Sequence, residues 1–198
     1  MTTPTMATVR KSGALGSRLT TILVTAVVAV LIVAVVYLTD SSPEDVTDVE
    51  LVGGMSGAAP RVGDMAPDFQ VTLIDGSTTS LSDYRGQPVW LTFGASWCAD
   101  CRAEAPDIEA ASQRYAAQGL TVLWISISED SQAARDYAKR AGLTFPIAAD
   151  PSDVIAGRYH ILGIPTHLFI DGDGIIQELR IGALHPDDMV RFVEALVA

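Results

Sequence analysis

The chain has 198 residues, of which 48% are hydrophobic and 19% are charged. This length provides for one domain of about 100 to 150 residues with an appendage, and it excludes two full domains. Residues 40–198 carry 24 acidic and 10 basic residues, a formal charge of −14, which argues against nucleic acid as a partner and predicts repulsion from anionic lipid surfaces.

An uncharged run of twenty residues extends from Leu19 to Leu38. As a helix that rises about 1.5 Å per residue, it matches the hydrocarbon core of a bilayer, which is about 30 Å thick. A buried core helix is rarely so long without a polar face, and a signal peptide has a shorter apolar region before its cleavage site. We predict an uncleaved transmembrane signal-anchor over residues 19–39, with a cleaved signal peptide as the alternative.

Basic residues determine the predicted orientation of this helix. Arg10, Lys11 and Arg18 precede it, whereas no basic residue follows it until Arg61. Because positively charged flanks stay in the cytoplasm, residues 1–18 are predicted to be cytoplasmic. The remainder of the chain is then extracytoplasmic, in a single-pass protein of the cell membrane.

A linker is predicted to follow the apolar run. Residues 40–60 are rich in Ser, Pro, Gly and acidic residues, and such a composition buries too little apolar area to fold. We therefore expect a flexible acidic linker over residues 40–60 and a folded domain over residues 61–198. Strands are predicted in this domain at 69–75, 88–95, 120–128, 145–149, 166–170 and 174–181. Helical segments are predicted at 81–86, 98–118, 131–142 and 186–197.

The order of these elements predicts the fold class. Strands alternate with helices in the first part of the domain, and a hairpin turn at the DGDG of residues 171–174 follows. This order is typical of an α/β fold whose mixed central sheet is flanked by helices, with parallel pairs early and an antiparallel pair late. The main pocket is expected at the carboxyl ends of the parallel strands, where the strand that ends at Ala95 leads to the cysteines. The two Asp of the DGDG also have the spacing of a calcium loop, but a third oxygen ligand is absent and a hairpin turn requires such residues.

The two cysteines of the chain are Cys98 and Cys101, between a predicted strand and a predicted helix. Free N–H groups and the helix dipole at a helix start favour a thiolate, here on Cys98, while Cys101 lies one turn further in. We predict that Cys98 is the nucleophile and that Cys101 resolves the mixed disulfide. A structural zinc site, which needs about four ligands, and a purely structural disulfide remain as alternatives.

Several motifs of the domain resemble the membrane-anchored TlpA-like (ResA/CcmG-type) thioredoxin-like oxidoreductases, which are related to the redoxin and AhpC/TSA proteins. The motifs are GDMAPDF (63–69), LSDYRGQPVWLTFGASWCADC (81–101), Pro106 and GIPTHLFID (163–171). The resemblance covers about residues 61–198. It implies a thioredoxin-like fold and thiol:disulfide oxidoreductase activity, with the dithiol of the CxxC motif as the redox centre and no other cofactor.

The resemblance also implies roles for individual residues. Trp97 covers one side of the cysteine pair, Pro165 is a cis-proline that faces it, and the backbone of Ile164 pairs with an extended substrate segment. Glu104 matches an acid of the same branch, and its helical spacing places it on the face of Cys101. We interpret Glu104 as the group that accepts or returns the proton of the resolving thiol, with a solvated helix carboxylate as the alternative.

Two positions depart from the thioredoxin pattern. Thr92 occupies the strand position that is acidic in ordinary thioredoxins, so a buried proton acceptor on that strand is missing. Between the cysteines, Asp100 follows Ala99 where many relatives have a proline. A carboxylate about 6 Å from the Cys98 sulfur opposes the thiolate by roughly 0.7 to 1.4 kcal/mol at an effective dielectric of about 40 to 80. We therefore assign Ala99 and Asp100 to redox tuning, with the hypothesis that Asp100 makes the protein a reductant.

The predicted function is the reduction of protein disulfides outside the cytoplasm, including, by family analogy, haem-attachment cysteines in cytochrome c maturation. The expected partners are protein thiols and disulfides and a membrane or extracytoplasmic electron donor. One alternative is a redoxin-type peroxidase, although residues 93–97 lack the Pro and Thr that this group places before its reactive cysteine. Another is a copper-binding assembly factor, which requires His167 near both sulfurs; we predict no metal ligands.

Overall fold

The computed structural model describes residues 14–39 and 57–198. The chain divides into two units, Met1–Val49 and Glu50–Ala198, and each is described by itself. The first contains helix α1, Ala14–Thr39, whose side chains are described from Ile22 to Ala34. In this described part of the chain, no helix combines the length and apolarity needed to cross a bilayer, so the signal-anchor at 19–39 stays a prediction. Most of the predicted cytoplasmic segment and linker, residues 1–13 and 40–56, lies outside the described residues.

The second unit contains the predicted thioredoxin-like domain. Its strands are β1 Gln70–Thr72, β2 Thr78–Ser80, β3 Val89–Gly94, β4 Thr121–Ile127, β5 Ile147–Asp150, β6 Thr166–Ile170 and β7 Ile176–Ile181. Its α-helices are α2 Ala99–Tyr115, α3 Ser131–Ala141, α4 Val154–Arg158 and α5 Pro186–Val197. Short 3-10 helices at Leu81–Tyr84 and Ala116–Gln118 complete the described elements.

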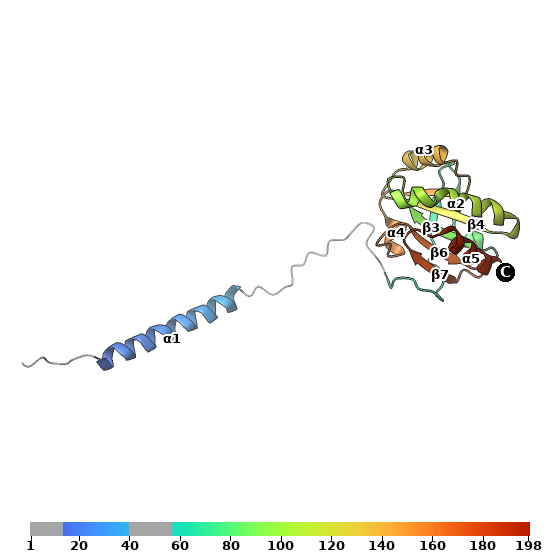
Figure 1. Cartoon of the computed structure of the whole chain (residues 1–198). Coiled ribbons are helices and arrows are strands. Elements are labelled where there is room, and N and C mark those ends of the chain that lie inside the picture. Colours follow the sequence, from blue (N-terminus) through green and yellow to red (C-terminus); the bar gives the residue numbers. More distant parts are fainter. Residues whose placement is uncertain (1–13, 40–56) are drawn as a thin grey trace, which may run out of the picture. The chain divides into compact units, whose positions relative to one another are not determined.

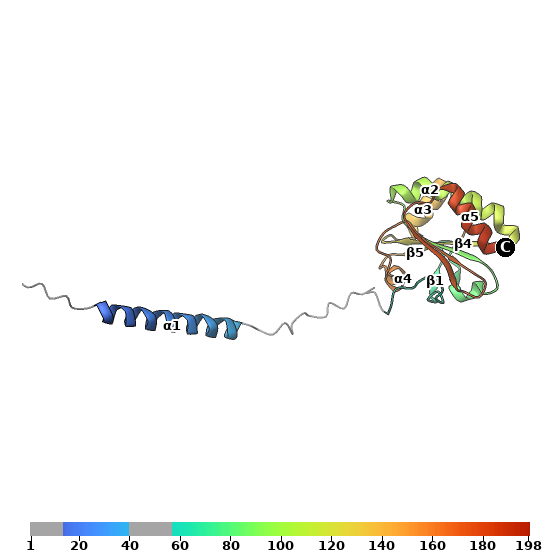
Figure 2. The ribbon, with the colours of Figure 1, turned by 60° about the horizontal axis from the view of Figure 1, so that its bottom comes forward.

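Five strands form the central sheet in the order β5-β4-β3-β6-β7, and β1 pairs with β2 in a separate hairpin. Strand β3 is parallel to β4, and β4 is parallel to β5. The pairs β3–β6 and β6–β7 are antiparallel, which confirms the predicted mixed sheet. Figure 2 shows α2, α3 and α5 over one face of the sheet, with α4 and β1 on the other.

The two faces of β3 illustrate why the sheet needs both layers. All six residues of this strand are buried, because side chains that alternate along a strand meet a packed layer on each side. Trp90 contacts the helical layer and stacks on Phe169 with the ring centroids 5.0 Å apart. Leu91 and Phe93 pack on the opposite side with the α4 layer. Trp124 of β4 is also fully buried, so both tryptophans belong to the core.

The structure differs from the predicted elements at β1 and β2 and at α4. The predicted strand 69–75 contracts to β1, because Asp75 accepts the N–H of Ser77 at 2.8 Å and turns the chain back into β2. Helix α4 has no counterpart in the prediction. It begins where the buried carboxylate of Asp150 accepts three successive N–H groups, those of Val154, Ile155 and Ala156, at 2.8 to 2.9 Å.

The DGDG segment forms the predicted hairpin turn between β6 and β7. The Gly174 N–H donates to the Asp171 carbonyl at 2.9 Å, and the Asp171 carboxylate accepts the Ile175 N–H at 2.9 Å. Gly174 has a φ of +82°, a conformation that glycine adopts without strain. Asp171 and Gly174 therefore have a structural role in the turn.

Candidate active site

The cysteine pair lies where β3 ends and α2 begins, at the carboxyl edge of the parallel strands. Cys98 is the N-cap residue of α2, and it forms a disulfide with Cys101 across a Cα–Cα distance of 5.3 Å. Cys98 is 8% exposed and Cys101 is 0% exposed. An incoming thiolate therefore reaches the Cys98 sulfur first, while the catalytic roles of the two residues stay predictions.

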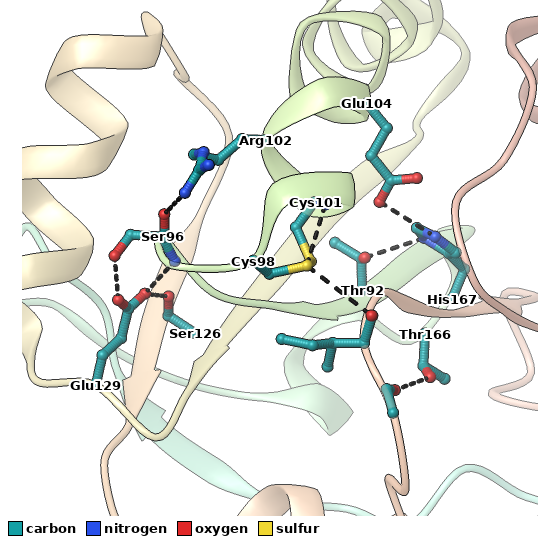
Figure 3. The surroundings of a disulfide bond; sticks show 12 residues. Thr92, Ser96, Cys98, Cys101, Arg102, Glu104, Ser126, Glu129, Thr166 and His167 are labelled. Carbon is teal, nitrogen blue, oxygen red and sulfur yellow. Dashed lines mark hydrogen bonds and ion pairs between the residues drawn. A yellow bond between two sulfur atoms is a disulfide. The ribbon is translucent and has the colours of Figure 1, made fainter.

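The start of α2 provides a local electrostatic environment for the Cys98 sulfur. Cys98 has the extended backbone of an N-cap residue, and the Cys101 N–H points to its Sγ at 3.2 Å (Figure 3). An N–H donor and the positive end of a helix dipole both stabilise a thiolate at this position. Asp100 lies exposed in the same first turn, where its negative charge has the opposite effect on the thiolate.

The loop before β6 lies against the disulfide. The Ile164–Pro165 peptide bond is cis, as the family resemblance implies. The carbonyl oxygen of Ile164 is 3.9 Å from Cys98 Sγ, and the Pro165 carbonyl accepts the Gly182 N–H at 2.8 Å. Trp97 precedes the pair and is 57% exposed. The structure thus brings the predicted substrate-binding residues to the Cys98 side of the disulfide, while their binding roles stay predictions.

Glu104 is buried, with only 4% of its surface exposed. The alternative of a solvated helix carboxylate is therefore wrong. One carboxylate oxygen, Oε2, accepts the Leu184 N–H at 3.1 Å, and the other, Oε1, lies 3.3 Å from His167 Nε2. Glu104 is one helical turn beyond the fully buried Cys101. Its role in proton transfer stays a prediction, now for a carboxylate with defined partners.

His167 is fully buried in β6, opposite Thr92 of β3. Its Nδ1 lies 3.0 Å from Thr92 Oγ1 and accepts the Trp90 Nε1–H at 3.3 Å. The two ring nitrogens thus face Thr92 and Glu104, as Figure 3 shows, and not the sulfurs that the copper hypothesis requires. Among the described residues, no three His, Cys, Asp or Glu side chains are grouped as metal ligands.

Glu129, just after β4, is a site residue that the sequence analysis missed. Its buried carboxylate accepts the Ser96 N–H at 2.9 Å and the hydroxyl protons of Ser96 and Ser126. Arg102 donates to the Ser96 carbonyl at 3.0 Å. These bonds fix the loop that leads into Cys98 (Figure 3). The sequence feature that could have identified Glu129 is an acidic residue just after the strand parallel to β3, because the side chains of an α/β site converge at the carboxyl ends of such strands.

Comparisons with protein families and curated proteins give matches to redox proteins. The family model described as AhpC/TSA family matches residues 62–179. The thiol-disulfide oxidoreductase ResA of Geobacillus kaustophilus is 35% identical over 138 residues, which are 70% of this chain and 79% of that protein. ResA of Oceanobacillus iheyensis is 37% identical over 131 residues, 64% of this chain and 68% of that protein.

Solved structures of similar fold include disulfide oxidoreductases. A thiol:disulfide interchange protein of the thioredoxin family from Chlorobium tepidum has a TM-score of 0.62 and 27% identity, and the match covers 72% of this chain and 100% of that one. A secreted Mycobacterium tuberculosis disulfide oxidoreductase homologous to E. coli DsbE has a TM-score of 0.59 and 26% identity, over 65% of this chain and 96% of that one.

Proposed function

The chain belongs to the AhpC/TSA family and to its ResA-like thiol-disulfide oxidoreductases, and from this premise we propose that it reduces protein disulfides on the outer side of a membrane. The observation that carries the proposal is the position of the pair. Cys98, at the surface end of the disulfide, lies beside the Ile164 carbonyl, whereas Cys101 is fully buried. A pair so placed offers one sulfur to a substrate and keeps the other for the resolving step.

The reaction needs no group beyond the dithiol and acid–base side chains. The Cys98 thiolate attacks a substrate disulfide, one substrate sulfur leaves as a thiolate, and a mixed disulfide forms. Cys101 then loses its proton and attacks Cys98, which re-forms the Cys98–Cys101 disulfide and releases the second substrate sulfur. The substrate gains two electrons and two protons. Another dithiol protein, in or outside the membrane, must return the pair to its reduced form.

The substrate-binding side is proposed to be the loop around the cis peptide bond. Ile164 offers its backbone to an extended substrate segment, and the exposed Trp97 covers the other side of the pair. This arrangement favours a disulfide within a polypeptide over a small disulfide. By analogy with the ResA-like relatives, we propose haem-attachment CxxCH segments as one substrate class, in cytochrome c maturation.

The proposed location depends on the sequence. The uncharged run from Leu19 to Leu38 and the basic residues before it support a domain outside the cytoplasm, with the N-terminus inside. An extracytoplasmic compartment is oxidising, so protein disulfides accumulate there and a dedicated reductant has substrates.

A competition between substrates tests the proposed function. The reduced full-length chain is mixed with a disulfide-bonded CxxCH peptide, with glutathione disulfide or with hydrogen peroxide at equal concentrations, and the loss of free thiols is followed by alkylation and mass spectrometry. We expect the peptide to oxidise the pair at least about tenfold faster than peroxide, because thiol–disulfide exchange depends on access to the attacking thiolate. We also expect the peptide to react faster than glutathione disulfide, which lacks an extended peptide segment.

The peroxidase alternative predicts the reverse order. If peroxide oxidises the chain faster than the peptide does, the proposed function is wrong and the chain acts as a redoxin-type peroxidase. Equal rates with the peptide and glutathione disulfide would contradict the proposed role of the Ile164 backbone.

A further inference from the structure

A row of buried polar groups connects α2 to the sheet directly behind the cysteine pair. It consists of Glu104 on α2, His167 on β6, and Thr92 and Trp90 on β3 (Figure 3 shows the first three). We propose that His167 is a positioning residue that holds the Glu104 carboxylate where it accepts the Cys101 proton. This inference rests on the proposed function, because it concerns the resolving step of disulfide exchange.

The pairing of the two side chains is the first argument. His167 Nε2 and Glu104 Oε1 form an ion-pair contact at 3.3 Å, and neither atom has a hydrogen-bond partner among the described residues. Both side chains are almost completely removed from solvent. Buried polar atoms require partners, since an unpaired group costs about 1 to 3 kcal/mol. Each side chain is therefore the polar partner that the buried atom of the other one requires.

The protonation of the imidazole ring follows from its other neighbour. The indole Nε1–H of Trp90 has only donor capacity, and it points to His167 Nδ1 at 3.3 Å. Nδ1 must then act as an acceptor and carries no proton. A neutral ring has its proton on the opposite nitrogen, Nε2, which faces Glu104. Trp90 thus selects the tautomer that carries its proton on Nε2, the nitrogen 3.3 Å from Glu104 Oε1.

The two oxygens of Glu104 are consequently held from two directions. His167 faces Oε1 from β6, and the Leu184 N–H from the segment before α5 donates to Oε2 at 3.1 Å. Groups with donor capacity on both sides limit the orientation of the carboxylate. A carboxylate held in this way, one helical turn from Cys101, is positioned to accept a proton. Glu104 thus takes the place of the proton acceptor that is missing from β3, where Thr92 stands, and a histidine on the neighbouring strand positions it.

The step in which His167 takes part can be written in full. In the mixed disulfide, the Cys101 S–H gives its proton to Glu104, and the thiolate attacks Cys98 Sγ. The bond between Cys98 and the substrate sulfur breaks while the Cys98–Cys101 bond forms. The substrate leaves as a thiolate and takes up a proton. His167 keeps its own proton throughout and contributes only through the position of Glu104.

A chromogenic disulfide separates this step from the first one. Mixing the reduced full-length chain with 5,5′-dithiobis(2-nitrobenzoate) in a stopped-flow instrument releases one thionitrobenzoate when Cys98 attacks and a second when Cys101 resolves. The first rate increases with reagent concentration and the second does not. We expect His167→Asn, whose amide reaches only the Nδ1 position, to slow the second phase about tenfold to hundredfold and to leave the first unchanged.

His167→Gln is the matched control, because its longer amide places a donor near the former Nε2 position. We expect it to restore most of the second-phase rate. Glu104→Gln, which cannot accept a proton, is expected to slow the second phase as well, and the double variant Glu104→Gln/His167→Asn to be no slower than Glu104→Gln alone.

Three outcomes would overturn the inference. The first is that His167→Asn slows both phases equally, and the second is that His167→Asn and His167→Gln have equal second-phase rates. The third is that the double variant slows the second phase by the product of the two single effects. Each outcome would mean that His167 is a packing residue only. Failure of the proposed function looks different, since peroxide would then oxidise the wild-type chain faster than the CxxCH peptide does, whatever the rates of the two phases.

Discussion

We expect Cys98→Ala to lower the rate of protein-disulfide reduction to that of the uncatalysed exchange. Cys98 is the sulfur at the surface end of the pair, beside the Ile164 carbonyl, and Cys101 is fully buried. With Cys98 removed, the remaining thiol cannot reach a substrate disulfide. The rate is measured with the CxxCH peptide, and Ala103→Ser, a small change at an exposed position of α2, is the control that should retain activity.

The complementary variant, Cys101→Ser, is expected to stop the reaction at the mixed disulfide. Cys98 still attacks, but the serine hydroxyl does not resolve the product, so a covalent adduct of chain and peptide accumulates and disappears on reduction. Mass spectrometry of the adduct identifies the sulfur that carries the peptide. Attachment of the peptide through Cys101 in a Cys98→Ser variant at the same rate would show that the assigned roles are reversed.

The second large effect, a loss of folding stability, is expected from Gly94→Ala at the end of β3. A Cβ atom at this position would overlap the indole of Trp124, with ring atoms Cη2 and Cε2 at 2.8 and 2.9 Å. Trp124 is fully buried and stacks on Phe145 with the ring centroids 6.2 Å apart, so the ring has little room to move. Overpacking of this kind typically costs about 1 to 3 kcal/mol, and we expect a loss near the upper end of that range.

Chemical denaturation followed by tryptophan fluorescence measures this loss. Gly163→Ala is the matched control, because nothing lies within 4 Å of the Cβ that it adds and its φ is outside the left-handed region. We expect the midpoint of denaturation to fall to a much lower denaturant concentration for Gly94→Ala and to change little for Gly163→Ala. Equal shifts would mean that the contact between Gly94 and Trp124 does not limit the packing of β3 against β4.

Much of the fold could be predicted because its signals are local. The apolar run of residues 88–95 indicated a buried strand, and the structure places β3 at the centre of the sheet with all its residues buried. The CxxC motif lies where such a strand passes into a helix, and the strand, the motif and the helix are all contained in residues 89–115. The hairpin turn before β7 was also recognisable, because Asp and Gly have specific backbone roles in turns.

The partners in the site could not be predicted in the same way, because they come from distant parts of the chain. Trp90 and His167 are 77 residues apart, and Ser96 and Glu129 are 33 apart. The burial of Glu104 depends on the segment before α5, whose Leu184 N–H it accepts across 80 residues. Helix α4 depends on one carboxylate, Asp150, that binds three N–H groups. Contacts between side chains on different strands of a sheet cannot be predicted from a single sequence.

The reduction potential of the Cys98–Cys101 pair tests most directly the claim that this protein is a reductant. The full-length chain is equilibrated in dithiothreitol or glutathione buffers of defined potential, and the reduced fraction is measured by thiol trapping. We predict a value near or below about −250 mV, in the range of dedicated reductants, because Asp100 in the first turn of α2 opposes the Cys98 thiolate and so favours the disulfide form. A value near −120 mV, typical of disulfide-forming oxidants, would contradict both the proposed direction of electron flow and the role assigned to Asp100.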